Sequence, residues 1–375
     1  MVKFQTAEKI SVNFYRDSGF HVINRYWHNP SSIPTLTSFF KPGKMRSMKK
    51  VSVIGAGAWG TTLSLLLAEK GHAVNLWVYE KELVDQMLKH RENKTFLPGF
   101  PLPENITVSC NLMEIETAEL IFFAVPTQFL RTLLKRHKLN LKKDAIAISA
   151  SKGIELKSLK LPLDIIKEEL NIHQIAVLSG PNLSHEIASG KPAATVIASD
   201  HLEIARQVQE EMTLERFRVY VNSDILGVQL GGALKNVVAI AAGVAEGLEL
   251  GHNALAGLII RGIAEISRLG VAMGAQLKTF SGLSGMGDLI VTCTSKLSRN
   301  HCVGEQLARG KKLDQILAEM KVVAEGVPTT RAALELADKY KVSMPLAREV
   351  YAALYDGKNP YQAITDLMHR TPTSE

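Results

Sequence analysis

Short apolar runs bounded by turn residues dominate the chain between residues 49 and 180. Each run holds four to six residues, many of them β-branched, a pattern that is typical of buried strands. The runs are Val51–Ile54, Ala73–Val78, Leu120–Val125, Ala145–Ala150 and Ile175–Leu178. We expect strands at these positions with helices between them, the alternation that characterises α/β folds.

The pattern changes after Asn222-Ser223-Asp224, where side chains that can cap a helix occur together. From there apolar residues recur at three- and four-residue spacing, the period of a helix with one buried face. The predicted helices cover residues 224–247, 253–273, 329–341 and 345–356. We therefore expect an α/β domain over residues 49–223 and an all-α domain over residues 224–375.

The net charge, the cysteines and the length of the uncharged stretches argue against several classes of protein. Residues 1–48 hold seven Lys and Arg against two acidic residues, so +5 of the net charge of +7 lies there. The remainder is nearly neutral, which argues against a nucleic-acid-binding face. The three cysteines lack metal-ligand spacing, and the uncharged stretch Val237–Ala245 that follows Lys235 and Asn236 is too short to span a membrane. We expect a cytoplasmic protein with no metal and no stable membrane insertion.

Residues 1–48 are basic, rich in aromatic and turn residues, and without a clear period. They lack the apolar stretch of a secretory signal. A transit peptide is one alternative, because the segment is basic and poor in acidic residues, and a true start at Met45 or Met48 is another. We expect an extension with no catalytic part, either disordered or preceding the true start.

Residues 55–60 read Gly-Ala-Gly-Ala-Trp-Gly, a complete G-x-G-x-x-G. The motif follows a predicted strand and opens a predicted helix over residues 61–70, the context of a Rossmann-type dinucleotide-binding domain with a doubly wound sheet. In that role Gly55 makes the tight turn, Gly57 lets the pyrophosphate approach, and Gly60 permits helix–strand contact. The phosphates are expected at the helix N-terminus, where backbone N–H groups are free.

Glu80 lies 20 residues beyond Gly60, where an acidic side chain binds the adenosine ribose of NAD. An arginine there would have indicated the 2′-phosphate of NADP. We expect NAD or NADP as the cofactor, with a lean to NAD that the adjacent Lys81 weakens. Polar side chains also follow the predicted strands, where such sheets bind ligands. They are Gln128, Lys152, Asn182 and Ser184.

Lys235 and Asn236 interrupt a stretch, residues 227–243, that is otherwise small, apolar or amide-bearing. In a helix, Gly231 and Gly232 share the face of Lys235. Glycine inside a helix costs roughly 1 kcal/mol relative to alanine, so we expect these two to make room for a close neighbour. A snorkelling lysine and a functional ammonium at the domain junction are both open alternatives.

A second concentration of chemistry lies within residues 281–310. Asp288 and Thr292 are four residues apart and share a helical face. Ser298 is an expected N-cap, with Arg299 and Asn300 in the first turn that follows. A cation there opposes the helix dipole unless it binds, with the free N–H groups, one anion such as phosphate. An exposed arginine beside an ordinary cap is an equal alternative.

Together these features indicate hydride transfer to a phosphorylated carbonyl compound. From Lys49 onward the chain resembles the NAD(P)-dependent glycerol-3-phosphate dehydrogenases of the bacterial, biosynthetic type. The motifs that carry this resemblance are VIGAGAWGT, LWVYE, FLPGFPLP, AVPTQFL, SKGIE, SGPNLSHE, GGALKNVVAIAAG, GLSGMGDLIVTCTSKLSRN and VAEGVPT. It implies reduction of dihydroxyacetone phosphate to sn-glycerol 3-phosphate, the backbone of glycerophospholipids, by a homodimer.

The resemblance also implies residue roles. Lys235 corresponds to the group that donates a proton to the ketone oxygen and accepts it in reverse. The rest of the catalytic set is Lys152, Asp288, Thr292 and Asn236. The substrate positions are Lys152, Gly180, Asn182, Lys235, Asp288, Ser298, Arg299 and Asn300. The cofactor positions are Gly55, Gly57, Ala58, Trp59, Gly60, Tyr79, Phe129, Lys152, Ser184, Arg299, Val323 and Glu325.

Other interpretations weigh less. Many bacterial members have a basic residue in place of Tyr79, so their preference for NADPH need not hold here, and the family pattern has no counterpart of residues 1–48. The SRN and SGPN motifs argue against a β-hydroxyacid-type dehydrogenase. The complete catalytic set argues against a redox-sensing module that only binds NAD(H). His301 and Glu305 are expected to form a surface pair.

Overall fold

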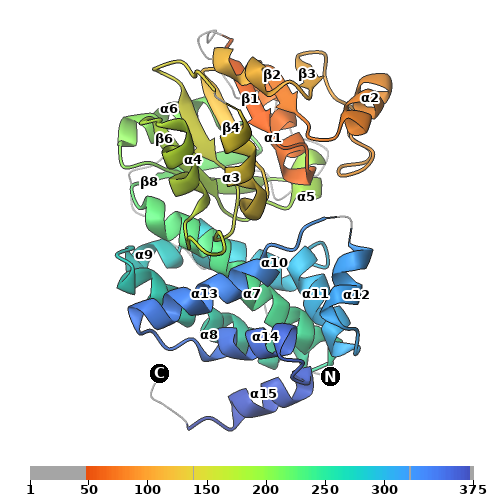
Figure 1. Ribbon diagram of the computed structural model, residues 1–375, viewed down its shortest axis with the longest axis vertical. Coiled ribbons are helices and arrows are strands. Elements are labelled where there is room, and N and C mark those ends of the chain that lie inside the picture. Colours follow the sequence, from red (N-terminus) through yellow and green to blue (C-terminus); the bar gives the residue numbers. More distant parts are fainter. Residues whose placement is uncertain (1–47, 138, 321, 372–375) are drawn as a thin grey trace, which may run out of the picture. The chain divides into compact units, whose positions relative to one another are not determined.

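The computed structural model describes residues 48–137, 139–320 and 322–371. Except for the exposed Met48, the expectations for residues 1–48 lie outside this part. Residues 48–375 form one compact unit. Within it an α/β layer structure, orange to green in Figure 1, is followed by a group of helices in green to blue.

An eight-stranded sheet with the order β3-β2-β1-β4-β5-β6-β7-β8 forms the centre of the first domain. Neighbouring strands are parallel except at the β6–β7 pair, which is antiparallel. The first six positions have the strand order of dinucleotide-binding sheets, which bind ligands beyond the carboxyl ends where the order reverses, here between β1 and β4. The strands are β1 Lys50–Ile54, β2 Ala73–Trp77, β3 Ile106–Ser109, β4 Leu120–Phe123, β5 Ile146–Ser149, β6 Ile175–Ser179, β7 Ala193–Ala198 and β8 Phe217–Asn222.

The five expected strands correspond to β1, β2, β4, β5 and β6, with ends that differ by at most two residues. Strands β3, β7 and β8 were missed. Both β3 and β8 are edge strands with alternating exposed residues, so neither shows a continuous apolar run. Strand β7 begins with two half-buried alanines, which give no strand signal.

Helices cover both faces of the sheet. The apolar residues of α1, α2 and α6 pack with Val51 and Val53 on one face. Those of α3, α4 and the 3₁₀ helix η4 pack with Ile121 and Phe123 on the other. The bounds are α1 Ala58–Glu69, α2 Lys81–His90, η4 Leu112–Thr117, α3 Thr127–Arg136, α4 Pro162–Leu170, α5 Ser184–Ala188 and α6 Leu202–Met212.

The second domain is helical in its described residues and has one continuous hydrophobic core. The expected helices correspond to α7, α8, α13 and α14, with ends within three residues. The helices are α7 Ile225–Gly247, α8 Gly251–Ala272, α9 Leu277–Phe280, η5 Leu283–Gly287, α10 Asp288–Thr294, α11 Arg299–Ala308, α12 Leu313–Glu319, α13 Gly326–Tyr340, α14 Pro345–Tyr355 and α15 Pro360–Met368.

Helix α7 lies at the centre of this domain, in contact with α8, α10, α11, α13 and α14. By length and composition alone it is the one described helix apolar enough to cross a membrane, although its longest uncharged stretch is short. However, 89% of its apolar window is buried inside the protein. The apolarity of α7 is therefore accounted for by its position as the core helix.

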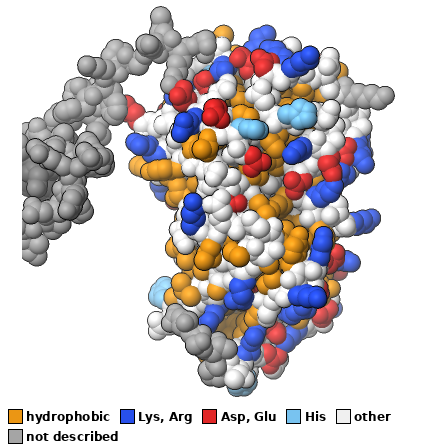
Figure 2. Space-filling view, turned by 90° about the vertical axis from the view of Figure 1, so that its left-hand side faces the viewer, with side chains coloured by type: hydrophobic (Ala, Val, Ile, Leu, Met, Phe, Trp, Pro, Cys, Tyr) orange, Lys and Arg blue, Asp and Glu red, His pale blue; other side chains and the backbone are white. Residues whose placement is uncertain are grey.

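On the face shown in Figure 2, positive and negative side chains alternate rather than gather into a region of one sign. This distribution fits the small net charge of the chain after residue 48.

Candidate active site

The glycine motif lies at the switch point of the sheet, between the end of β1 and the start of α1. Gly55 has φ +106°, and a Cβ there would lie 2.7 Å from the Ala124 carbonyl oxygen. A Cβ on Gly60 would lie 1.8 Å from the Gly55 oxygen, so only glycine allows α1 to begin here. At Gly57, by contrast, nothing lies within 4 Å of an added Cβ.

This open space is the observation that fits a dinucleotide. Gly57 is the N-cap of α1, no side chain caps that helix, and its first turn holds no acidic residue. The backbone N–H groups of the first turn therefore have no capping side chain, which leaves them available to a pyrophosphate. Trp59 in the same turn has a buried indole N–H without a partner among the described residues.

The other expected cofactor residues lie at the ends of neighbouring elements. Tyr79 and Phe129 are exposed by 65% and 58%, which is unusual for large aromatic side chains. The Tyr79 ring meets Trp77 edge-on, with 6.2 Å between ring centroids. Glu80 is the exposed N-cap residue of α2, and its side chain makes no capping hydrogen bond. Ser184 begins α5, and its carbonyl oxygen accepts a hydrogen bond from the Thr62 hydroxyl on α1.

Lys235 is buried in the middle of α7, with 7% of its surface exposed. Its ammonium group donates to the Asp288 carboxylate and, at 2.7 Å, to the Thr292 hydroxyl. Both partners are on α10, one turn apart, and the Thr292 hydroxyl donates to the Asp288 carbonyl oxygen at 2.6 Å. The snorkelling alternative is therefore wrong, because this lysine is buried and paired.

Burial lowers the pKa of Lys235 to about 8, against the opposing effect of Asp288 and with help from the positive charge of Lys152. An ordinary lysine side chain has its pKa near 10.5. The ammonium can consequently release and regain a proton close to neutral pH, which is the property of a general acid–base group.

Lys152 reaches the same carboxylate from the other domain. It follows β5, and its ammonium group donates to Asp288 at 2.6 Å and to the Gly180 carbonyl oxygen at 2.9 Å. Asp288 is 1% exposed, so this carboxylate lies buried between two ammonium groups. The group of three carries a net charge of +1 when all are ionised, which favours an anionic ligand.

Gly231 and Gly232, about one helical turn before Lys235, each leave space for a close neighbour. A Cβ on Gly231 would lie 2.5 Å from the Ser284 carbonyl oxygen, and so would block the close approach of η5. A Cβ on Gly232 would lie 2.5 Å from the Ser179 hydroxyl and 3.5 Å from the Lys152 stem. Gly231 therefore lets η5 approach α7, and Gly232 lets the ends of β5 and β6 do so.

Helix α11 brings a third set of side chains beside α7. The two helices touch through Gly243 and Gly304, where an added Cβ would lie 1.9 Å from a carbonyl oxygen of the other helix. The Asn300 side chain donates to the Asn236 oxygen at 2.9 Å. Ser298 caps α11 by accepting from a backbone N–H at 3.2 Å, as its position in the sequence predicts.

Arg299 is exposed at the start of α11 and donates to the Val323 carbonyl oxygen at 3.0 Å. Glu325 lies two residues after Val323. Its carboxylate accepts a hydrogen bond at 2.6 Å from the backbone N–H of Thr127, the first residue of α3. Burial raises the pKa of Glu325 to about 7, although this hydrogen bond and Arg299 oppose the shift. A Cβ on Gly153 would lie 2.6 Å from the Glu325 oxygen, so Gly153 provides space for this contact.

Gly180 and Asn182 follow β6 at the same edge of the sheet. Gly180 has φ +145°, a conformation that side-chain-bearing residues rarely adopt. The Asn182 amide donates to the Thr195 hydroxyl at 3.1 Å, while its oxygen is buried without a partner among the described residues. Ser179, beside Gly232, also has a buried hydroxyl with no such partner.

The predicted surface pair of one histidine is wrong, and three residues of the site were not predicted. His301 is buried, with its Nε2 atom 3.1 Å from a Glu246 oxygen, and does not pair with Glu305 on the surface. The correct partner lies on α7, far away in the sequence. The residues that were missed are Thr127, Gly153 and Ser179. All three had a signal, because Thr127, Gly153 and Ser179 lie in the quoted motifs AVPTQFL, SKGIE and SGPNLSHE. No group of three or more metal-ligating side chains occurs among the described residues.

Two family profiles match this chain. Residues 50–205 match the NAD-dependent glycerol-3-phosphate dehydrogenase N-terminus, and residues 224–365 match the C-terminus of the same family. A protein named glycerol-3-phosphate dehydrogenase [NAD(P)+] from Citrifermentans bemidjiense is 49% identical over 331 residues, 87% of this chain and 99% of its own length. One of the same name from Syntrophotalea carbinolica is 47% identical over 329 residues, with the same coverage.

Solved structures agree with these matches. The crystal structure of glycerol-3-phosphate dehydrogenase from Coxiella burnetii covers 86% of this chain and 99% of its own, with 36% identity and a TM-score of 0.83. Both halves of the molecule, in the same order, thus match one family. The chain belongs to the NAD-dependent glycerol-3-phosphate dehydrogenase family.

Proposed function

We propose that the protein catalyses the reversible, NAD(P)H-dependent reduction of dihydroxyacetone phosphate to sn-glycerol 3-phosphate, with Lys235 as the proton donor. The observation that carries this proposal is the buried ammonium of Lys235, which has a pKa of about 8 and is held by Asp288 and Thr292. It lies at the junction of the helical domain with a sheet whose switch point fits a dinucleotide.

When bound, the nicotinamide supplies the hydride, and the chain supplies the proton. Lys235 donates a proton to the oxygen of the ketone, a form of help that is typically worth about 10²–10⁴-fold in rate. Asp288 fixes the direction of the ammonium, and Thr292 accepts its second hydrogen bond. Lys152 keeps Asp288 paired and leaves the site positive enough to attract an anionic substrate.

The first turn of α11 is the proposed phosphate site. Arg299 is exposed there and can form two parallel hydrogen bonds with phosphate oxygens. Asn300 is held by Asn236 and by the backbone N–H of Gly326 at 2.9 Å, so it connects this turn with the residue after Lys235. Gly180 and Asn182 close the substrate site from the sheet edge.

For the cofactor, we propose a preference for NAD over NADP. Glu80 is exposed at the end of β2, where it can accept from both ribose hydroxyl groups, and its charge repels a 2′-phosphate. Gly57, Ala58 and Trp59 would hold the pyrophosphate through the α1 N-terminus. The residues proposed to border the rest of the cofactor are Tyr79, Phe129, Ser184, Val323 and Glu325.

In the cell, we propose a cytoplasmic homodimer that supplies sn-glycerol 3-phosphate for glycerophospholipids. The match with bacterial relatives over nearly their whole length supports this role.

The test is the oxidation of NADH and NADPH, in parallel, with dihydroxyacetone phosphate as acceptor. We expect turnover with both and a higher kcat/KM with NADH. A panel of short 2-oxo acids serves as the control for a β-hydroxyacid dehydrogenase. Turnover of the oxo acids alone, or tight cofactor binding with no turnover, would reject the proposed reaction.

A further inference from the structure

The loop that carries Lys152 is held from outside the active site. This loop, residues 150–161, connects β5 to α4 and places the Lys152 ammonium against Asp288 and the Gly180 carbonyl oxygen. Two of its residues, Lys157 and Leu159, have φ +70° and +58°, a left-handed conformation that is costly for residues other than glycine. Such a loop keeps one conformation only when its surroundings fix it.

Helix α3 provides these surroundings through two side chains one turn apart. The Gln128 amide donates to the Ile154 carbonyl oxygen at 2.7 Å, and its oxygen accepts from the Leu156 backbone N–H at 3.0 Å. Arg131 binds the carboxylate of the residue between them, Glu155. Helix α3 therefore holds three consecutive residues that begin two positions after Lys152.

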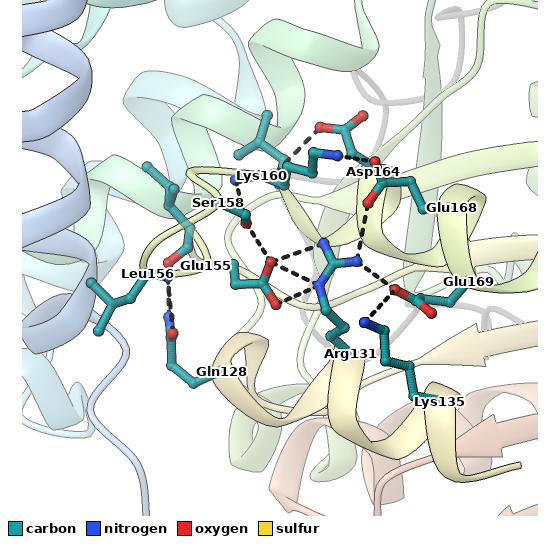
Figure 3. Close-up of polar contacts among 12 residues, drawn as sticks. Gln128, Arg131, Lys135, Glu155, Leu156, Ser158, Lys160, Asp164, Glu168 and Glu169 are labelled. Atoms are coloured by element: carbon teal, nitrogen blue, oxygen red, sulfur yellow. Dashed lines mark hydrogen bonds and ion pairs between the residues drawn. The ribbon is translucent and has the colours of Figure 1, made fainter.

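The Arg131–Glu155 contact is a bidentate ion pair, drawn at the centre of Figure 3. The Arg131 Nε atom donates to both Glu155 oxygens at 2.9 and 3.0 Å, and Nη2 donates to Oε2 at 2.9 Å. Glu155 is 9% exposed and also accepts from the Ser158 hydroxyl of the same loop. A fork of this kind fixes orientation as well as distance, which a lysine in place of Arg131 cannot do.

Two further carboxylates hold Arg131 in place from α4. Its Nη1 atom donates to Glu168 at 3.1 Å and to Glu169. Lys160 and Lys135 pair with these carboxylates, so the charges of the group balance. Although burial favours the neutral form of Glu155, the hydrogen bonds from Arg131 and Ser158 lower its pKa below the usual value. The pair is therefore ionised throughout the working pH range.

We propose that Arg131 and Gln128 are positioning residues for Lys152: through Glu155 and the backbone of residues 154–156 they hold the loop so that the Lys152 ammonium reaches Asp288 and the substrate. This inference rests on the proposed function, because it concerns the rate of the same reaction. Neither residue touches the reacting groups.

The kinetic test compares Arg131→Gln, Arg131→Lys and Glu155→Gln with two controls. Arg136→Gln alters an exposed arginine of the same helix, and Lys142→Gln alters an exposed lysine between α3 and β5. We expect the first three to lower kcat/KM for dihydroxyacetone phosphate by about 10- to 100-fold, the range for a small misplacement of a catalytic group. The Kd for NADH, measured by fluorescence, should stay within threefold, and both controls should be near wild type.

A double-mutant cycle separates positioning from general stabilisation. In the Lys152→Met background, Arg131→Gln should lower kcat/KM no further, because the group that it positions is gone. The inference would be overturned if the losses in kcat/KM of the two single variants multiplied in the double variant. It would also be overturned if the kcat/KM of Arg131→Gln lay within twofold of that of Arg136→Gln.

Hydrogen exchange gives a readout that does not depend on activity. The amides of Glu155 and Leu156 should exchange faster in Arg131→Gln and in Glu155→Gln than in Arg136→Gln. If the wild-type protein does not reduce dihydroxyacetone phosphate, the proposed function is wrong. If instead the exchange rates of these amides are unchanged, Arg131 does not fix the conformation of the loop and the inference itself is wrong. If Arg131→Gln does not fold, Glu155→Gln and Gln128→Leu provide the same comparison.

Discussion

Replacing Lys235 with methionine tests its proposed role as proton donor while preserving the fold. Methionine keeps a long, flexible, apolar side chain in the buried position but has no proton to transfer. Loss of general-acid help should lower kcat for dihydroxyacetone phosphate reduction by about 10²–10⁴-fold. The group that remains near the ketone, Lys152, is held by Asp288 and the Gly180 carbonyl oxygen and is not expected to replace it.

The expected effect on stability is small because two contributions oppose each other. Burial disfavours the charged form of Lys235 by several kcal/mol, enough to lower its pKa to about 8 even beside Asp288. Methionine removes this cost. It also takes one partner from the buried Asp288, and breaking a buried ion pair costs about 3–5 kcal/mol. Asp288 keeps Lys152 at 2.6 Å, which places the loss at the low end of that range.

The assay combines steady-state kinetics, NADH affinity by fluorescence and Tm by differential scanning fluorimetry. Lys278→Met, which alters an exposed lysine of α9, is the matched control. We expect a collapse of kcat with a Tm within a few degrees of wild type and an unchanged Kd for NADH. Turnover within tenfold of wild type would refute the role of Lys235 as proton donor.

Three further predictions concern the same site. In the proposed mechanism reduction needs protonated Lys235 and oxidation needs the neutral form, so kcat/KM for reduction should fall as pH rises above about 8, while that for oxidation should rise towards a plateau. Parallel profiles in the two directions would contradict this. Gly57→Ala should keep its Tm but lose NADH affinity, because its Cβ meets only open space. Gly60→Ala should lose several degrees of Tm, because its Cβ meets a backbone oxygen at 1.8 Å; equal Tm values for the two variants would count against the close helix–strand contact. Glu325 has its pKa raised to about 7, so the wild-type fold loses stability as pH rises through 7. Glu325→Gln should consequently raise Tm at pH 8 more than at pH 5, and equal shifts would speak against a buried carboxylate.

The parts of the fold that the sequence predicts are those with strong local signals. Four of the five predicted strands, β1, β4, β5 and β6, are buried on both faces along their apolar runs, which are therefore nearly continuous. The glycine motif adds a turn that only glycine can make, and Ser298 caps α11 through its own side chain. Each of these signals lies within a few residues of the element that it specifies.

What the sequence did not predict depends on contacts between distant segments. Helix α7 illustrates this, because Gly231 and Gly232 indicate a close neighbour but not which one. The neighbours turned out to be Ser284 and the side chains of Ser179 and Lys152. In the same way the partner of His301 is on another helix, whereas the local pattern favoured a residue one turn away. Periodicity gives the face that a residue occupies, but the tertiary fold decides what lies opposite.

The two lysines of the site are coupled across the domain junction, and this coupling is measurable. The positive charge of Lys152 lowers the pKa of Lys235, in addition to the larger effect of burial. Lys152→Met removes that charge without exposing Lys235 to water, so the pKa of Lys235 should rise above its value of about 8. Reduction by this variant should be slower but should persist to higher pH than in the wild-type enzyme. A downward shift of the profile would instead mean that Lys152 acts mainly by keeping Asp288 in place. An upward shift would show that the α/β domain sets the acidity of a proton donor that belongs to the helical domain.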